Sequence, residues 1–131
     1  MKFFQKASDG GKDSGVTAYF LVEIKSLFSI TLLHFEPSHR EAFHSHAFNA
    51  VTLWLKGVAV EEVRDEKGIT VNLWAAGKFK YTPRELMHRI KVLRKGAWAL
   101  SIRGSWQEQW QEYHPSIRKV ITLTHGRKQI N

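Results

Sequence analysis

The feature that most constrains this sequence is a succession of short segments rich in β-branched and aromatic residues. They are of strand length and include VTAYFLV, SLFSITLLHF, AVTLWLKG, ITVNLW, AWALSIRG and KVITLT. Glycines 57, 68, 77, 96 and 104 fall between or at the ends of such segments, at intervals typical of hairpins. No long amphipathic helix is visible, so the pattern predicts an all-β chain, a meander that closes into a sandwich or barrel.

The chain has the length and apolar content of one domain. Its 131 residues are 43% hydrophobic, which is enough for a single core. The segment from Ala7 to Gly15 is small and polar, so we expect a flexible N-terminal arm over residues 1–15 and one β-domain over 16–131. There is no apolar signal-peptide core and no run near the roughly 20 residues of a membrane span. A soluble, intracellular protein is therefore expected.

Charge and cysteine content limit the partners and the metal ligands. The net charge of +8 makes nucleic acids and anionic substrates natural partners, but the basic residues are scattered singly along the strands, which favours a solvated surface over nucleic-acid binding. With no cysteine, any metal ion must be held by nitrogen and oxygen atoms. No Ser-His-Asp arrangement, phosphate-binding glycine loop or close carboxylate pair is visible as a motif.

A histidine pair is the strongest candidate for chemistry. His44 and His46 are two residues apart, so on a strand they share a face and both imidazoles can bind one ion. His88 begins the segment MHRIKVL on the same face as Ile90 and Val92, and is the best third ligand. The other interpretation is that His88 is a hydrogen-bonded core residue and that the pair is exposed and polar.

Alternation along the strands adds two more candidates. His34 shares a face with the apolar Phe28, so it is interpreted as a core histidine, a second-shell partner of the metal site or a fourth ligand. Arg103 lies on the face opposite Trp98. If that face lines the barrel, Arg103 can clamp a carboxylate or phosphate through two hydrogen bonds; otherwise it is exposed or pairs with Glu108.

One segment has helical spacing. Within Ser105 to Tyr113, the aromatic residues Trp106, Trp110 and Tyr113 are four and three positions apart. This spacing predicts a short helix with the three aromatic residues on one side, where they cover the core or a partner.

Several of these motifs resemble a known family. The block FHSHAFNAVTLWLKG resembles the first motif of cupins, and PRELMHRI resembles the second. More closely, the runs REAFHSHAF, HRIKVLRKGAWALSIRGSWQEQWQEYHP and TLTHGRK resemble small cupin-like proteins often encoded by tailed bacteriophages. The resemblance covers about Ser26 to Lys128.

The resemblance implies a double-stranded β-helix, or jelly roll. It also implies a divalent metal ion (iron, zinc, nickel or manganese) in the barrel mouth, with His44, His46 and His88 as ligands, and it favours Arg103 as a substrate-binding residue. Cupins commonly dimerise, so a homodimer is expected, in the host cytoplasm if the protein is phage-encoded.

The sequence departs from the cupin pattern at one ligand. Many cupins have a glutamate four or five residues after the second histidine, where this chain has Ala50 and Val51. The sequence is in this respect similar to three-histidine cupins, which include thiol dioxygenases. Glu61 or Glu62, on the following strand, could in principle supply a carboxylate instead.

These observations lead to one preferred function and two others. We expect a three-histidine metal-dependent oxygenase that acts on a small chelating substrate. The first alternative is a non-catalytic phage module that binds a small ligand, a sugar or a host protein. The second is a basic protein that binds nucleic acid, with an affinity that falls steeply with salt.

Overall fold

All regular structure in the described part of the chain is β-strand. The computed structural model describes residues 2–9, 15–39, 43–92, 96–124 and 128–130. Residues 10–14 of the expected arm and 125–127 of the TLTHGRK motif lie outside this description. Every strand pairing is antiparallel, which confirms the all-β prediction.

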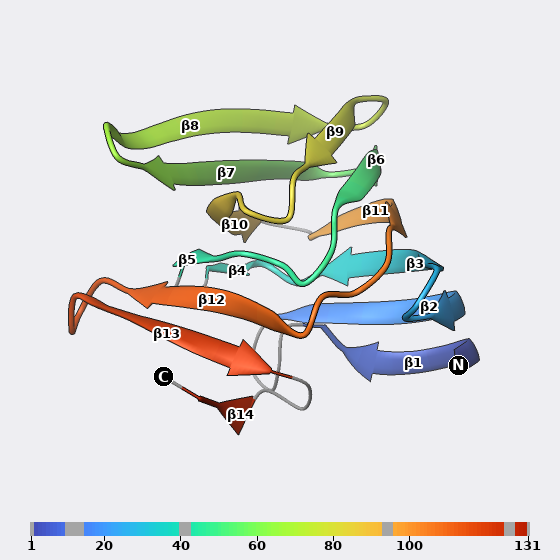
Figure 1. Ribbon diagram of the computed structural model, residues 1–131. Coiled ribbons are helices and arrows are strands. Elements are labelled where there is room, and N and C mark those ends of the chain that lie inside the picture. The colour runs from blue at the N-terminus through green and yellow to red at the C-terminus, as the bar shows by residue number, and fades with distance from the viewer. Residues whose placement is uncertain (1, 10–14, 40–42, 93–95, 125–127, 131) are drawn as a thin grey trace.

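The strands form two sheets (Figure 1). Across the first sheet the order is β1 (Lys2–Ser8), β2 (Val16–Ile24), β3 (Phe28–Phe35), β11 (Ala97–Arg103), β6 (Ala50–Lys56) and β9 (Phe79–Thr82). Across the second it is β14 (Lys128–Gln129), β13 (Lys119–Thr124), β12 (Gln109–His114), β5 (Phe43–His44), β10 (Met87–Val92), β7 (Val58–Asp65) and β8 (Gly68–Ala75). The short β4 (Ser38–His39) also pairs with β10.

The N-terminal segment differs from the expected arm. Strand β1 pairs with β2 from Lys2 opposite Glu23 to Ser8 opposite Thr17, and so forms the edge of the first sheet. In the sequence KFFQKAS, the large apolar residues are the adjacent Phe3 and Phe4, and both are exposed. An edge strand needs little burial because its stability comes from backbone pairing, so composition alone did not distinguish it from an arm.

The inner faces of the two sheets enclose a core that is apolar at one end. Trp54 and Ala99, from the first sheet, pack there with Ala59 and Val92, from the second. Toward the other end the inward positions become polar: on β11 the buried Ala99 is followed by Ser101 and Arg103. Polar groups in an interior must be paired or bind a ligand, so this end is the candidate functional region.

The turn between β6 and β7 is packed tightly against the beginning of β11 and the residue before it. Gly57 has a φ of +87°, a conformation that favours glycine. A Cβ atom at this position would overlap the carbonyl oxygen of Gly96 and lie 2.8 Å from the Cα of Ala97. This contact fixes the start of β11, the strand that carries Arg103.

The predicted helix at Ser105 to Tyr113 is absent. The segment is irregular up to Gln107 and bends at Glu108, and β12 begins at Gln109. Trp106 and Trp110 still meet, with ring centres 6.1 Å apart, because the irregular backbone brings them together. No helix in the described residues is long and apolar enough to cross a membrane.

Candidate metal centre

Strand β5 and the loop after it hold the histidine pair. The Ser45 backbone N–H donates to the Gln111 carbonyl at 2.8 Å, and the Gln111 N–H donates to the Ser45 hydroxyl at 2.9 Å. The His46 N–H donates to the carbonyl of Arg84 at 3.2 Å. These bonds fix the backbone on both sides of the pair, although β5 itself ends at His44.

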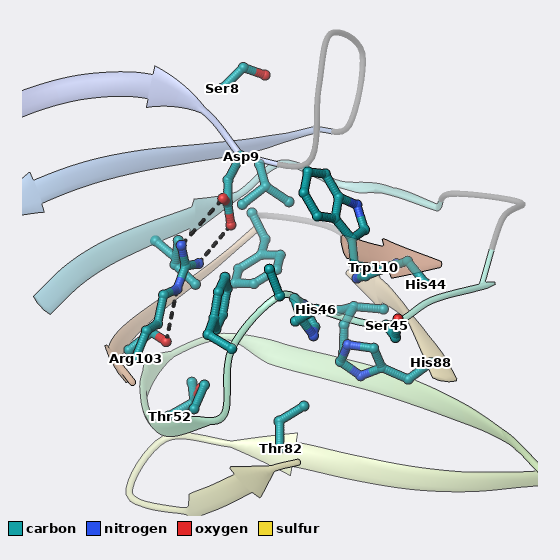
Figure 2. A pocket seen from close by; sticks show the side chains of 18 of the residues that line it. Ser8, Asp9, His44, Ser45, His46, Thr52, Thr82, His88, Arg103 and Trp110 are labelled. Carbon is teal, nitrogen blue, oxygen red and sulfur yellow. Dashed lines mark hydrogen bonds and ion pairs between the residues drawn. The ribbon is translucent and has the colours of Figure 1, made fainter. Parts of the chain in front are cut away.

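His88 reaches the pair from the neighbouring strand. It lies directly opposite His44 in the β5–β10 register. The three imidazole rings form a nearly equilateral triangle, with ring centres 4.8 Å apart for His44 and His88, 4.9 Å for His44 and His46, and 5.0 Å for His46 and His88. One ligand atom from each ring lies within 4.8 Å of the other two. The structure therefore brings the three predicted ligands together (Figure 2).

The chemistry of these rings fits a metal ion. The Nδ1 of His46 and the Nε2 of His88 are buried and have no hydrogen-bond partner among the described residues. Burial lowers the pKa of His46 well below its ordinary value, and repulsion from His44 and His88 lowers it further. Burial also lowers the pKa of His88. Neutral imidazoles with buried lone pairs are the form that binds metal ions.

Glu61 fixes the orientation of His88. Its Oε2 accepts a hydrogen bond from the His88 Nδ1 at 2.5 Å, which leaves the Nε2 as the acceptor atom of the ring. The Glu61 side chain is 1% exposed and also accepts a bond from the Trp74 Nε1 at 3.1 Å. A carboxylate that holds the far nitrogen of a histidine is a common support for a metal ligand.

Lys80 completes this buried network. Its Nζ forms an ion pair with the Oε2 of Glu61 and donates to the Thr82 hydroxyl at 2.8 Å. Burial alone raises the pKa of Glu61, but the hydrogen bond from His88 and the charge of Lys80 lower it to about 2. Burial lowers the pKa of Lys80, and Glu61 opposes that change. Glu61 is thus a carboxylate at neutral pH.

The two glutamates considered as ligands have different positions. Glu61 points inward but binds the Nδ1 of His88, and the candidate metal group in the described residues consists of the three histidines. Glu62 lies on the other face of β7 and pairs with Arg89 at 3.1 Å. Ala50, at one of the positions where many cupins have a glutamate, faces inward with no ligand atom.

The histidines line a cavity of about 410 Å³ between the two sheets. Three polar residues on neighbouring strands form part of its wall. Ser101 of β11 lies opposite Thr52 of β6, and Thr52 lies opposite Lys80 of β9. The aromatic side chains of Phe48 and Trp110 also line it. The cavity thus combines a polar wall with aromatic surface, as binding sites for small molecules do.

Arg103 lies in this cavity, so of the two positions that the sequence left open the structure has the one that lines the barrel. Its side chain is 4% exposed, and its Nη2 donates to Asp9 Oδ2 at 2.8 Å. Its guanidinium carbon lies 4.7 Å from the centre of the Phe48 ring. In Figure 2 the Arg103–Asp9 pair and the His88 ring lie on opposite sides of the view.

His34 does not join the cluster. It lies on the outer face of β3, where its ring centre is 4.4 Å from that of Trp98, and it is not part of the cavity wall. The inward residues of β3 are instead Ser29, Thr31, Leu33 and Phe35. The more apolar face of β3 points outward, so the structure does not support the expected contact between His34 and the metal ligands.

Sequence reasoning missed the roles of Lys80 and Asp9. Lys80 is a charged residue on an inward position of the alternating strand β9, between the exposed Phe79 and Tyr81. That inverted pattern was a detectable signal. Asp9 follows a strand that was interpreted as an arm, and nothing in the sequence connects it with Arg103.

Solved structures of oxalate decarboxylase have a similar fold, and the first two described here are of the Bacillus subtilis enzyme. One, from work on the Mn(II) centres of that enzyme, aligns with a TM-score of 0.61 and 22% identity over 81% of this chain and 29% of that one. The enzyme at pH 4.6 gives 0.59 and 22% over 81% and 30%. A third structure, from work on proton-coupled electron transfer, gives 0.58 and 23% over 70% and 26%.

These similarities confirm the cupin fold. The chain spans less than a third of the length of these oxalate decarboxylase chains. No protein-family model matches the sequence, and no curated protein matches it. The fold and the three-histidine cluster together support a cupin that binds a divalent metal ion.

Proposed function

We propose that His44, His46 and His88 bind one divalent metal ion and that the protein is a metal-dependent oxygenase for a small acidic substrate that chelates the ion. The observation that carries this proposal is the triangle of three imidazoles at the wall of a cavity large enough for a small molecule. A bound ion supplies Lewis acidity, and iron(II) would add reactivity toward dioxygen.

The residues of the chain have distinct roles in this proposal. Three neutral ligands leave coordination positions for a substrate on the cavity side. Glu61 holds the His88 ring with its Nε2 toward the cluster, and Lys80 keeps Glu61 in place. Arg103 binds the acidic group of the substrate, and the aromatic surface of Phe48 and Trp110 keeps water away from it.

Metal content tests the site. We expect untagged protein, purified without chelators, to contain near-stoichiometric metal by plasma mass spectrometry, and His44→Ala, His46→Ala and His88→Ala to lose it. The matched control is His34→Ala, which removes an imidazole from the outer face of β3 and leaves the cavity unchanged. Metal that stays bound when both His44 and His46 are replaced would contradict the ligand assignment.

The alternative function is a non-catalytic module that holds a small ligand in the same cavity. The polar and aromatic wall favours it, because such a wall can bind a ligand without a metal ion. Capture of a ligand that survives removal of the metal, together with the absence of oxygen uptake after anaerobic loading with iron(II), would support the module and exclude the oxygenase.

The proposed biological setting rests on sequence motifs alone. The resemblance of REAFHSHAF and TLTHGRK to phage proteins supports a phage-encoded protein that acts in the host cytoplasm.

We also propose a homodimer that forms through the outer face of the first sheet. Leu53 of β6 lies opposite Phe79 of β9, Val51 lies opposite Tyr81, and Ile102 of β11 continues the same surface. Phe79 is 69% exposed, Tyr81 62% and Ile102 51%. A stable interface buries about 800 Å² per partner, and each aromatic side chain contributes about 150–250 Å². An apolar surface that spans three neighbouring strands can pack against a second copy of itself.

A further inference from the structure

The buried guanidinium of Arg103 is held by a carboxylate from a distant part of the chain. Nη2 and Nη1 donate to the two carboxylate oxygens of Asp9 at 2.8 and 3.4 Å, and Nε donates to the Ser101 hydroxyl at 3.4 Å. This is the two-point contact that arginine makes with a carboxylate ligand. Arg103 is 4% exposed, whereas the Asp9 side chain is 31% exposed.

The Asp9 side chain is partly exposed, although its backbone is anchored. The Asp9 backbone N–H donates to the Val16 carbonyl at 2.9 Å, which anchors the residue at the end of the β1–β2 hairpin. Rotation of the side chain alone would move the carboxylate away from Arg103, toward the solvent that it already contacts. The pair is therefore asymmetric, with a fixed buried cation and a partly exposed anion.

Both partners belong to the wall of the cavity that holds the histidine cluster. Asp9, Arg103 and Lys25 line this cavity, and so does Glu23. Glu23 of β2 lies opposite Ser29 of β3, and Ser29 lies opposite Arg103 of β11. A carboxylate ligand that replaced the Asp9 side chain would leave the charge balance at this end of the cavity unchanged. It would also avoid the large cost of leaving a buried arginine unpaired.

We propose that Asp9 is an internal stand-in for the carboxylate of a small acidic ligand, which competes with Asp9 for Arg103. The inference deepens the proposed function, because it gives the chemical class of the ligand and an internal competitor that weakens its binding. The anion site does not require a metal ion, so it can be tested on chelator-treated protein.

Rescue by acetate, the free equivalent of the aspartate side chain, tests the proposal. We expect Asp9→Ala to lower the melting temperature of the chelator-treated protein because it leaves Arg103 without its carboxylate. Sodium acetate should then raise the melting temperature of Asp9→Ala by several degrees more than sodium chloride at the same ionic strength. Wild-type protein should show a much smaller difference between the two salts, since Asp9 already occupies the site.

Two further variants separate this effect from general salt stabilisation. Glu62→Ala removes the carboxylate that pairs with Arg89 on the outer face of β7, and should show no acetate-specific rise. Replacing Arg103 with Gln in the Asp9→Ala background should abolish the rise. Inorganic phosphate in place of acetate tests the other anion that arginine binds well, and a larger rise with phosphate would overturn the assignment to carboxylates.

Lack of rescue would show that Asp9 is only a structural partner of Arg103, and would overturn the proposal. If Asp9→Ala does not fold, the same comparison is made with Asp9→Asn by following ¹³C-labelled acetate in NMR titrations. Weaker or equal acetate binding in Asp9→Asn relative to wild type would likewise contradict the competition. Acetate rescue in a protein that never binds metal would separate this inference from the proposed metal site.

Discussion

At the scale of single residues, two neighbouring glutamates show how position on a strand decides function. Glu61 and Glu62 are adjacent on β7, so their side chains point to opposite faces. Glu61 lies inside and holds the His88 ring, whereas Glu62 lies outside and pairs with Arg89. The same amino acid therefore supports the candidate metal centre at one position and a partly exposed ion pair at the next.

This difference leads to a prediction about metal affinity. Glu61→Gln keeps the size of the side chain but removes the charge that orients and strengthens His88 as a ligand. We expect the dissociation constant for the metal to rise by about 10- to 100-fold, measured by competition with a chromogenic chelator. Glu62→Gln is the matched control and should leave the affinity unchanged. Equal effects of the two substitutions would mean that Glu61 does not act through His88.

At the scale of strands, the sequence predicted some faces correctly and others not. On β11 buried and more exposed positions alternate, and Arg103 lies on the buried face, one of the two positions that the sequence left open. On β3 the alternation predicts that the more apolar face, with Phe28, Ile30 and Leu32, packs in the core, but this face points outward. Hydrophobic alternation identifies two faces but not which one is buried, and a large apolar outer surface reverses the assignment.

Contacts between residues on different strands could not all be predicted from local sequence patterns. The histidine ligands could be selected because two of them share a strand region and the third follows a turn. Lys80 of β9 contacts Glu61 of β7 across the space between the two sheets, and Asp9 contacts Arg103 of β11 from the end of β1, a strand that does not pair with β11. Strand order and register are set by the packing of the whole barrel, so a single sequence does not reveal these contacts.

The β6–β7 turn allows a prediction about stability. Gly57 and Gly77 both have positive φ values, 87° and 90°, but of the two only Gly57 packs closely against other residues, Gly96 and Ala97. We expect Gly77→Ala to cost about 1 kcal/mol of unfolding free energy from backbone strain. Gly57→Ala should cost about 3 kcal/mol, because overlap with Gly96 is added to that strain. Urea denaturation measures both, and equal costs would show that the close approach is easily relaxed.

At the scale of the whole molecule, the outer face of the first sheet carries exposed apolar residues on three neighbouring strands. Its exposed residues come from β11, β6 and β9, the strands whose inner faces carry Arg103, Thr52 and Lys80. Packing against a second copy would bury this face and hold these strands flat. Dimerisation would in this way support the cavity wall from outside.

The dimer predicts a specific response to a buried charge. Phe79→Asp should convert the dimer to a monomer, because it places a carboxylate in the apolar interface without a partner. Sedimentation equilibrium measures the mass directly. Ile117→Asp, at an exposed apolar residue (64% exposed) in the turn between β12 and β13, is the control and should remain dimeric. A monomeric wild-type protein at high concentration would exclude this interface.

The histidine triangle has a further consequence for a chain that contains no cysteine. His46 and His88 are separated in sequence by β6, β7, β8 and β9, so an ion bound to both would close this long stretch into a loop. A covalent bridge between distant residues stabilises the folded state because it lowers the conformational entropy of the unfolded chain, and a pair of coordination bonds can act in the same way. The ion would then be a reversible cross-link, and the lifetime of the folded protein would depend on the supply of metal around it.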